Sequence, residues 1–173
     1  MVESAMAVVN VSKMVIRDLS LPICSFTTCF KGFDKVETVK QILGERAEDV
    51  LSNLKVEFTE ETRYMKVSDV DGHLLVNPNY LCSGDIVDIY LDVIHELVHV
   101  RQFMDGRALF DENRRYVDRD TEVEAYQAAV QEARMLGFSD EKICRYLRSE
   151  LLNDDDLARL AKILNVNLEA SRG

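Results

Sequence analysis

Apolar positions early in the chain follow a helical period. Between residues 36 and 54, valine, leucine and alanine recur at steps of three and four. This spacing places them on one face of a helix. Asp34 precedes the pattern and is the expected N-cap.

The period then changes to two, which indicates strands. The segments "KVEFT" and "TRYMKV" alternate apolar and polar residues. Asp71-Gly72 supplies the positive φ angles of a tight hairpin, so "HLLVNP" should return antiparallel to "TRYMKV" and end at Pro78. The following "NPNYLCSG" carries turn signals.

The second half of the chain is predicted to be helical. Residues 85–104, capped by Ser83 or Asp85, are apolar on nearly all sides, which is typical of a helix at the centre of its domain. A charged loop with one helical turn, "DGRALFDENRRYVDRD", separates it from a helix over residues 121–136. Two more helices, "SDEKICRYLRSELL" and "NDDDLARLAKIL", should begin at Ser139 and Asn153. The predicted fold class is α+β.

The composition of the chain limits the kinds of partner that it is expected to bind. The 173 residues are 47% hydrophobic and carry a net charge of −10, so we expect a folded protein without a nucleic-acid partner. No apolar run reaches the roughly 20 residues that span a bilayer. We therefore expect no membrane partner and a cytoplasmic location.

The cysteines Cys24, Cys29, Cys82 and Cys144 form no CxxC pair. We expect free thiols that are buried or half-buried. Two alternatives stay open for "CSFTTC": a local disulfide between Cys24 and Cys29, or a thiolate that occupies a metal and keeps the protein latent.

The segment "DVIHELVHVRQ" carries the candidate chemistry. His95 and His99, four residues apart on a helix, can direct ring nitrogens at one metal ion. Glu96, the next residue after His95, can reach a water molecule on that ion and take its proton. Two imidazoles and a carboxylate among isoleucine, valine and leucine would be costly without a partner, and a metal such as Zn²⁺ provides one.

The third protein ligand is not obvious from this segment. Asp105 occupies the last position of a metzincin-like pattern, but Gln102 replaces the required glycine, and continued helix would turn Asp105 away. His73 is a second candidate, although a histidine after a hairpin turn is more often exposed. In "DRDTEVEAYQAAV", Glu124 has a structural use in a capping box with Thr121, which leaves the other glutamate of the segment unexplained.

The motif "HELVH", followed by a helix that contains "EVEA", resembles gluzincins. The compact order of elements over residues 54–136 is most similar to the minigluzincins and to metallopeptidases that cleave phage-type repressors. The resemblance implies that Zn²⁺ is held by His95, His99 and Glu122, with Glu96 as the general base. It also implies an extended peptide substrate bound at an exposed sheet edge, for which "HLLVNP" is the expected strand.

The resemblance also suggests a domain plan. Residues 1–173 would form one metallopeptidase-like domain: an N-terminal extension (1–34), a catalytic core (35–137) and a C-terminal helical segment (138–173). The sheet, antiparallel or mixed, would pack on the HExxH helix and the glutamate-bearing helix. The C-terminal helices are expected to pack in the core, while covering of the cleft, as in minigluzincin zymogens, is the alternative.

Two further side chains have open roles. Tyr126 stands where many gluzincins have an aspartate that orients a zinc-bound imidazole; its hydroxyl would serve a histidine or the oxyanion, or its ring would pack in the core. Asp92, three residues before His95, is either a hydrogen-bond acceptor for a ligand or an exposed helix residue. The resulting hypothesis is a zinc metallopeptidase; the alternatives are a non-catalytic binding or regulatory module with the same fold, and an enzyme that hydrolyses a small amide.

Overall fold

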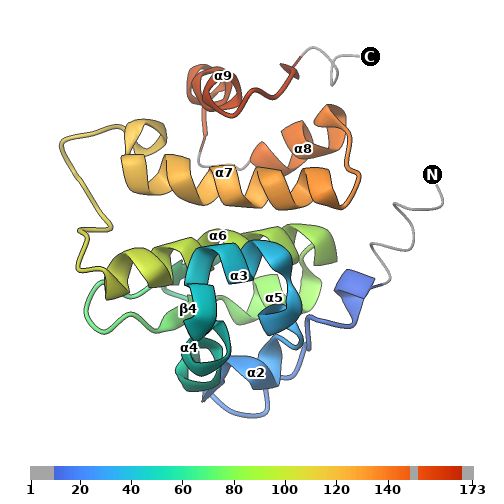
Figure 1. Cartoon of the computed structure of the whole chain (residues 1–173), viewed down its shortest axis with the longest axis vertical. Coiled ribbons are helices and arrows are strands. Elements are labelled where there is room, and N and C mark those ends of the chain that lie inside the picture. The colour runs from blue at the N-terminus through green and yellow to red at the C-terminus, as the bar shows by residue number, and fades with distance from the viewer. Residues whose placement is uncertain (1–9, 149–151, 169–173) are drawn as a thin grey trace.

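Two long helices, α6 (Ile86–Met104) and α7 (Asp120–Met135), lie side by side at the centre of the molecule (Figure 1). The structure is a computed structural model that describes residues 10–148 and 152–168. Helix α6 is buried on nearly all sides, as its continuous apolar sequence predicts. Its N-cap is Asp85, whose carboxylate accepts hydrogen bonds from the backbone N–H groups of Val87 and Asp88.

A four-stranded mixed sheet supports α6. The strands are β1 (Ile23–Ser25), β2 (Lys55–Phe58), β3 (Met65–Val67) and β4 (Leu74–Val76), in the order β1-β2-β4-β3. Strands β3 and β4 form the predicted antiparallel hairpin, with Lys66 opposite Leu75. The sheet and the surrounding helices confirm the predicted α+β class.

The prediction that "HLLVNP" is an edge strand is wrong. Strand β4 lies inside the sheet because it pairs with β3 on one side and, in parallel, with β2 on the other. The edge strands are β1 and β3, and β3 packs against α6. Any strand added next to α6 must therefore pair with β3.

The helix predicted over residues 36–54 is interrupted. It consists of α3 (Glu37–Leu43), a 3₁₀ turn (Gly44–Arg46) and α4 (Ala47–Asn53). Gly44 has φ +64°, a conformation that an α-helix cannot continue through. The predicted cap at Asp34 is also wrong: Asp34 lies in a separate 3₁₀ turn, and Val36 begins α3 without a side-chain cap.

The segment "NPNYLCSG" forms a helix rather than turns alone. Helix α5 (Pro78–Ser83) starts at a proline, whose missing N–H is not needed in the first turn. The Asn77 side chain caps α5 by accepting from the N–H groups of Asn79 and Tyr80. Pro78 thus ends the hairpin, as predicted, but also opens a helix.

Residues 10–34 contribute to the core. Helix α2 (Phe26–Cys29) follows β1, and Phe26, Phe30 and Phe33 form a buried cluster of rings. The ring of Phe33 also packs against Tyr90 on α6, with centroids 5.2 Å apart.

Helices α8 (Asp140–Leu147) and α9 (Asp154–Ile163) follow α7 and begin at the predicted caps, Ser139 and Asn153. Helix α9 lies on the side of α7 away from α6 (Figure 1), whereas α8 reaches α6 through a hydrogen bond from Tyr146 to Asp92. Most apolar residues predicted to pack in the core do so; Ile163 is exposed, and Leu151 is outside the described residues.

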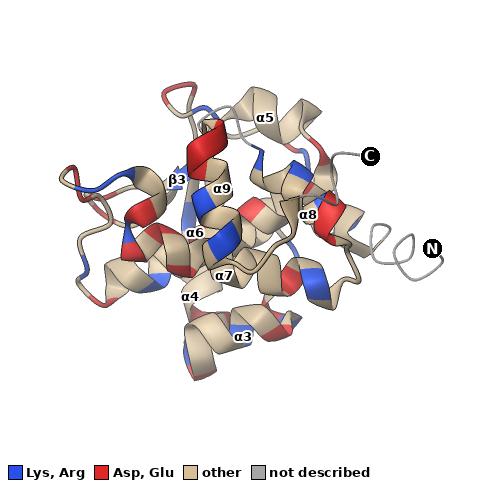
Figure 2. Cartoon of the chain, turned by 90° about the horizontal axis from the view of Figure 1, so that it is seen from above, with Lys and Arg blue, Asp and Glu red and all other residues tan. Residues whose placement is uncertain are grey.

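Charged residues of both signs are distributed over the fold. In the ribbon of Figure 2, Lys and Arg are interspersed with Asp and Glu, and the first turn of α9 is acidic. Of the helices in the described ranges, none has the length and apolar character to cross a membrane.

Candidate metal centre

Helix α6 brings the two histidines of the motif together. One helical turn separates His95 from His99, and their Nε2 atoms lie 3.1 Å apart. Both side chains are buried (each residue is 6% exposed), so their polar atoms cannot rely on bulk water for hydrogen bonds.

Helix α7 adds the predicted third group. The Glu122 Oε2 atom lies 3.3 Å from His95 Nε2 and 3.4 Å from His99 Nε2. It is buried, and no hydrogen-bond partner is found for it among the described residues. The three atoms therefore form a nearly equilateral triangle from two helices.

The triangle has the dimensions of a zinc site. Tetrahedral ligands at zinc–nitrogen and zinc–oxygen distances near 2.1 Å are separated from one another by about 3.4 Å. The observed separations of 3.1, 3.3 and 3.4 Å match this value. Two imidazoles and one carboxylate are also a donor set typical of catalytic zinc, so the residues fit the ion.

Gln102 determines how His99 is oriented. The amide N–H₂ group of Gln102 donates to the Thr121 carbonyl at 3.1 Å and to Glu124 Oε2 at 2.7 Å. Both partners can only accept, so the amide oxygen must face His99 Nδ1, which lies 2.8 Å away. His99 therefore carries a proton on Nδ1, and its Nε2 atom points into the triangle, where a metal ion would replace any proton on Nε2.

Glu124 anchors this arrangement from α7. Its carboxylate accepts from Gln102 and forms ion pairs with Arg101 and, at 2.6 Å, with Arg107. Together these three interactions outweigh partial burial and lower the pKa of Glu124 to about 2. The predicted capping box is wrong: α7 begins at Asp120, and the Thr121 hydroxyl donates to the Leu109 carbonyl instead. Two guanidinium groups and an amide compete successfully for the Glu124 carboxylate.

Glu96 stands beside the triangle. One of its oxygens is within 4.8 Å of the ring nitrogens of His95 and His99. Burial raises the pKa of Glu96 to about 8, although the charge of His99 and the backbone N–H of Val67 favour its ionised form. Its Oε2 atom lacks a hydrogen-bond partner in the described part of the chain, so Glu96 is available to a ligand or a water molecule.

The buried groups of the triangle shift one another's pKa values. Burial lowers the pKa of His95. For His99, burial is outweighed by Glu122 and Glu96, which raise its pKa to about 9. Burial also opposes ionisation of Glu122, but the two imidazoles keep the pKa of this carboxyl below its usual range. Without a metal, the triangle therefore retains a proton on His99 that a metal ion would replace.

The other candidate ligands lie elsewhere. Asp105 is exposed at the end of α6. The ring nitrogens of His73 contact Asp71 and Glu57, the latter at 2.9 Å. Neither residue lines the two cavities at the triangle described below.

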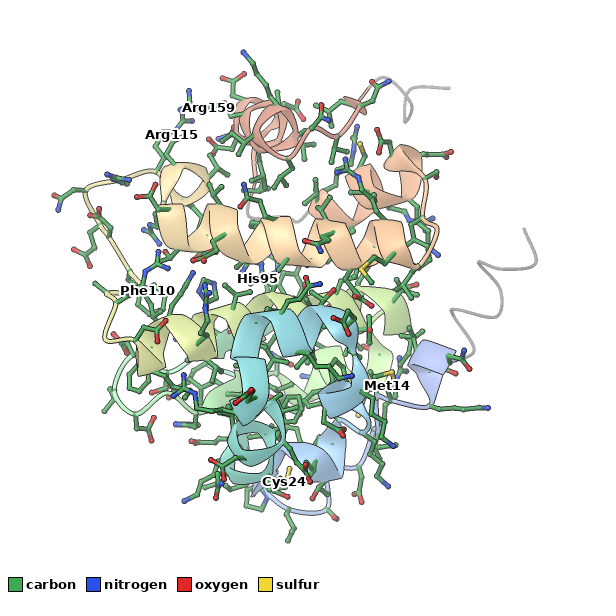
Figure 3. The ribbon with its side chains drawn as sticks, viewed as in Figure 1. Met14, Cys24, His95, Phe110, Arg115 and Arg159 are labelled. Atoms are coloured by element: carbon green, nitrogen blue, oxygen red, sulfur yellow. The ribbon has the colours of Figure 1, made fainter. Side chains whose placement is uncertain are left out.

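All four cysteines are free thiols, with Cys29 and Cys144 buried, Cys24 half-buried and Cys82, against expectation, exposed. The Sγ atoms of Cys24 and Cys29 contact each other at 2.7 Å. Cys24 lies at the end of the molecule away from α9 and apart from His95 (Figure 3), so the structure does not bring this segment to the triangle.

Two tyrosines border the triangle. The Tyr126 ring meets His95 edge-on, with centroids 4.5 Å apart, and its hydroxyl lies 3.3 Å from that of Tyr116. Burial raises the pKa of both phenols, so both keep their protons. No local pattern in the sequence singles out Tyr116, because it reaches the triangle from the segment between α6 and α7.

Asp92 has neither of its predicted roles. Its carboxylate accepts hydrogen bonds from Tyr80, at 2.6 Å, and from Tyr146 of α8, at 3.0 Å, rather than from a metal-binding histidine. It is half-buried rather than exposed. These partners come from α5 and α8, which the helical spacing around Asp92 could not reveal.

Two cavities meet at Glu96. The first, of about 250 Å³, lies between residues 61–67, which include β3, and the loop residues Leu109, Phe110 and Tyr116. The second, of about 170 Å³, contains five tyrosines and is called the tyrosine pocket below. Both are lined by His95, Glu96, Met65, Tyr64 and Tyr116, so the two cavities adjoin at these residues, while His99 and Glu122 line the first cavity.

No family model, no curated protein and no solved structure matches this chain. The resemblance to gluzincins therefore depends on the motif residues themselves. The chemical capacity of the site follows from its geometry: a nitrogen–nitrogen–oxygen triangle that fits zinc, a buried carboxylate beside it and two cavities that adjoin at His95 and Glu96.

Proposed function

We propose that this chain is a zinc-dependent metallopeptidase of the gluzincin type. The observation that carries the proposal is the convergence of His95 Nε2, His99 Nε2 and Glu122 Oε2 at 3.1–3.4 Å, with Glu96 adjacent and outside the triangle. A site that serves only structure usually has four protein ligands, whereas three leave one position for water or substrate.

Glu96 acts as the general base in this proposal. Zn²⁺, when bound, supplies a Lewis acid that lowers the pKa of water and polarises a carbonyl oxygen. The Glu96 carboxylate accepts the proton of the attacking water and then delivers it to the departing amine. Its unpartnered Oε2 and its burial suit this transfer, because no competing hydrogen bond must be broken.

The substrate lies along β3 as an extended strand. Asn77 N–H donates to the Tyr64 carbonyl and Ser68 N–H to the His73 carbonyl, so Tyr64 and Ser68 face β4. In an antiparallel ladder the intervening residues face the other way, so the N–H and C=O groups of Met65 and the C=O group of Val67 are directed to the open edge, where the Val67 N–H bonds to Glu96. A peptide paired there would cross the first cavity next to Glu96.

The hydrogen-bonded pair of Tyr116 and Tyr126 supplies one donor for the carbonyl oxygen, because one of its two protons is shared between the hydroxyls. Their hydroxyls lie 3.3 Å apart beside the triangle, and both keep their protons because of burial. A donor that faces the developing negative charge lowers the barrier for attack on the peptide bond.

The first prediction concerns Glu96→Gln. The variant should bind zinc as the wild type does, since Glu96 is not one of the three triangle groups, and should lose peptidase activity by at least about a hundredfold because the general base is missing. Metal content would be measured by elemental analysis of protein purified without chelator, and activity with a fluorogenic peptide library.

The matched control is Glu45→Gln, an exposed residue of the 3₁₀ turn Gly44–Arg46; it should change neither quantity. Folded wild-type protein that takes up no zinc would contradict the proposal. Zinc-loaded wild type that cleaves nothing in the library would favour the non-catalytic binding module instead.

A further inference from the structure

The tyrosine pocket gathers most of the chain's tyrosines in one place. Five of the six tyrosines line it: Tyr64, Tyr80, Tyr116, Tyr126 and Tyr146. They come from the segment before β3, from α5, from the loop after α6, from α7 and from α8. Aromatic rings attract cations through their negative faces, and sites that bind ammonium groups are commonly lined by several of them.

Acidic groups line the same pocket from α6. Asp88, Asp92 and Glu96 follow one another at intervals of four residues and therefore share one face of the helix. The row begins beside the triangle and continues into the pocket. A side chain that enters from the triangle would pass Glu96 and reach Asp92.

Asp92 lacks a cationic partner. Its two oxygens accept from the Tyr80 and Tyr146 hydroxyls, and within the described ranges no Lys, Arg or His forms an ion pair with it. Burial raises the pKa of Asp92 to about 7, as expected for a carboxyl that lacks a neighbouring positive charge. Each oxygen retains capacity for a second hydrogen bond.

Two arginines also line the pocket and could repel a basic side chain. Arg145 and Arg148 are exposed residues of α8 and of the position directly after it. Burial raises the pKa of Asp88 to about 6, and the positive charge of Arg145 offsets only part of this rise. An exposed guanidinium is screened by solvent, so it does little to neutralise Asp92 below it.

We infer that the tyrosine pocket is the subsite that receives a basic side chain, lysine or arginine, of the peptide substrate next to the cleaved bond. This inference rests on the proposed peptidase function. The aliphatic stem of the substrate residue lies among the tyrosine rings, and its charged end donates to Asp92. The first cavity, with Met65, Leu109 and Phe110 in its wall, takes an apolar side chain on the other side of the bond.

The inference is tested with matched peptides. The peptides are acetylated and amidated hexapeptides in which flanking alanines surround a central pair, either Leu and Lys or Leu and norleucine. Each pair is made in both sequence orders, so that either direction of substrate binding is tested. Lysine and norleucine differ chiefly in the ammonium group, so a difference between them reports charge recognition. For zinc-loaded wild type, kcat/KM should be about tenfold higher for the better lysine peptide than for its norleucine partner.

Asp92→Asn should remove most of this preference, because asparagine keeps an acceptor for a tyrosine but has no charge. Asp49→Asn on α4, an exposed aspartate outside both cavities, is the control and should keep the full preference. Circular dichroism would verify that each variant is folded, and Asp92→Glu, which keeps the charge, should retain a preference for lysine.

A binding measurement separates this inference from the proposed function. Calorimetric titration of zinc-loaded Glu96→Gln protein with the same peptides should show tighter binding of the lysine peptide, and the added Asp92→Asn change should abolish the difference. Preferential binding without wild-type cleavage would contradict the peptidase proposal but support the cation subsite. Equal binding and cleavage of both peptides would overturn the subsite, as would a preference for a glutamate peptide, which would assign the pocket to Arg145 and Arg148.

Discussion

Gln102 decides which nitrogen of His99 faces the triangle. Its amide oxygen accepts from His99 Nδ1–H, and its N–H₂ group is held by Thr121 and Glu124. One side chain therefore joins the HExxH helix to the helix that carries Glu122. Such partners set the tautomer of a metal-binding histidine and increase its basicity.

Gln102→Met should weaken zinc binding by about 10- to 100-fold, because methionine keeps the length of the side chain but cannot accept from His99. Competition with a chromophoric chelator would measure the affinity. The same substitution at Gln127, an exposed position on α7, is the control and should leave the affinity unchanged. Wild-type affinity in Gln102→Met would show that His99 is held in place by the helix alone.

The residues of the triangle were accessible to sequence reasoning, but their partners were not. Helical spacing is enough to place His95 and His99 together, and the motif resemblance pointed to Glu122, which the structure brings within 3.4 Å of both. In the sequence Gln102 stands out only as the residue that breaks a metzincin pattern, although its position three residues after His99 places both on neighbouring turns. Tyr116 and the partners of Asp92 depend on contacts between distant segments, which no local pattern encodes.

At the scale of elements, Glu132 joins three helices. It is 4% exposed on α7, and its two carboxyl oxygens accept from Tyr90 of α6, at 2.7 Å, and from Thr38 of α3, at 2.6 Å. A buried carboxyl group is tolerated when both oxygens are hydrogen-bonded. Glu132 thus fixes how α3 and α7 pack around the helix of the HExxH motif.

Tyr90→Phe should lower the free energy of unfolding by about 1–2 kcal/mol, because it leaves one oxygen of a buried carboxyl group without its donor. Urea unfolding followed by circular dichroism would measure this change. Tyr64→Phe is the control, since within the described part of the chain the Tyr64 hydroxyl has no hydrogen-bond partner and its residue is only half-buried. In a double variant that also carries Thr38→Val, the loss of unfolding free energy should be smaller than the sum of the losses in the two single variants. This is expected because Tyr90 and Thr38 donate to the same carboxyl group.

Periodicity predicted most helices and strands, but not the order of the strands. The alternation in "KVEFT", "TRYMKV" and "HLLVNP" is local, whereas the parallel pairing of β2 with β4 depends on where the chain between them runs. That pairing moved the open edge from β4 to β3 and with it the proposed position of the substrate. The break at Gly44 was missed because the apolar positions keep their helical spacing across it.

At the scale of the whole molecule, the C-terminal helix secures the loop that reaches the triangle. Arg115 pairs with Asp156 at 2.7 Å, and Asp118 pairs with Arg159 at 2.6 Å, so two ion pairs flank Tyr116. Figure 3 shows Arg115 and Arg159 close to α9. Buried residues from Val11 to Val166 belong to one hydrophobic cluster, which connects this loop, α6 and α7 through a common core.

Because α6 and α7 each supply part of the triangle, metal binding should stabilise the whole fold. A ligand that binds only the folded state contributes about 4 kcal/mol when its free concentration is a thousandfold above its dissociation constant. For a chain of this size, that corresponds to a rise in Tm on the order of 10 °C. Differential scanning calorimetry of chelator-treated protein, with and without added Zn²⁺, would measure the shift. In Glu122→Gln, the carboxylate of α7 is lost and the zinc-dependent shift should fall by more than half, while the metal-free Tm serves as the internal reference. A full shift in this variant would mean that zinc is held by α6 without α7, and the three-residue site would have to be redrawn.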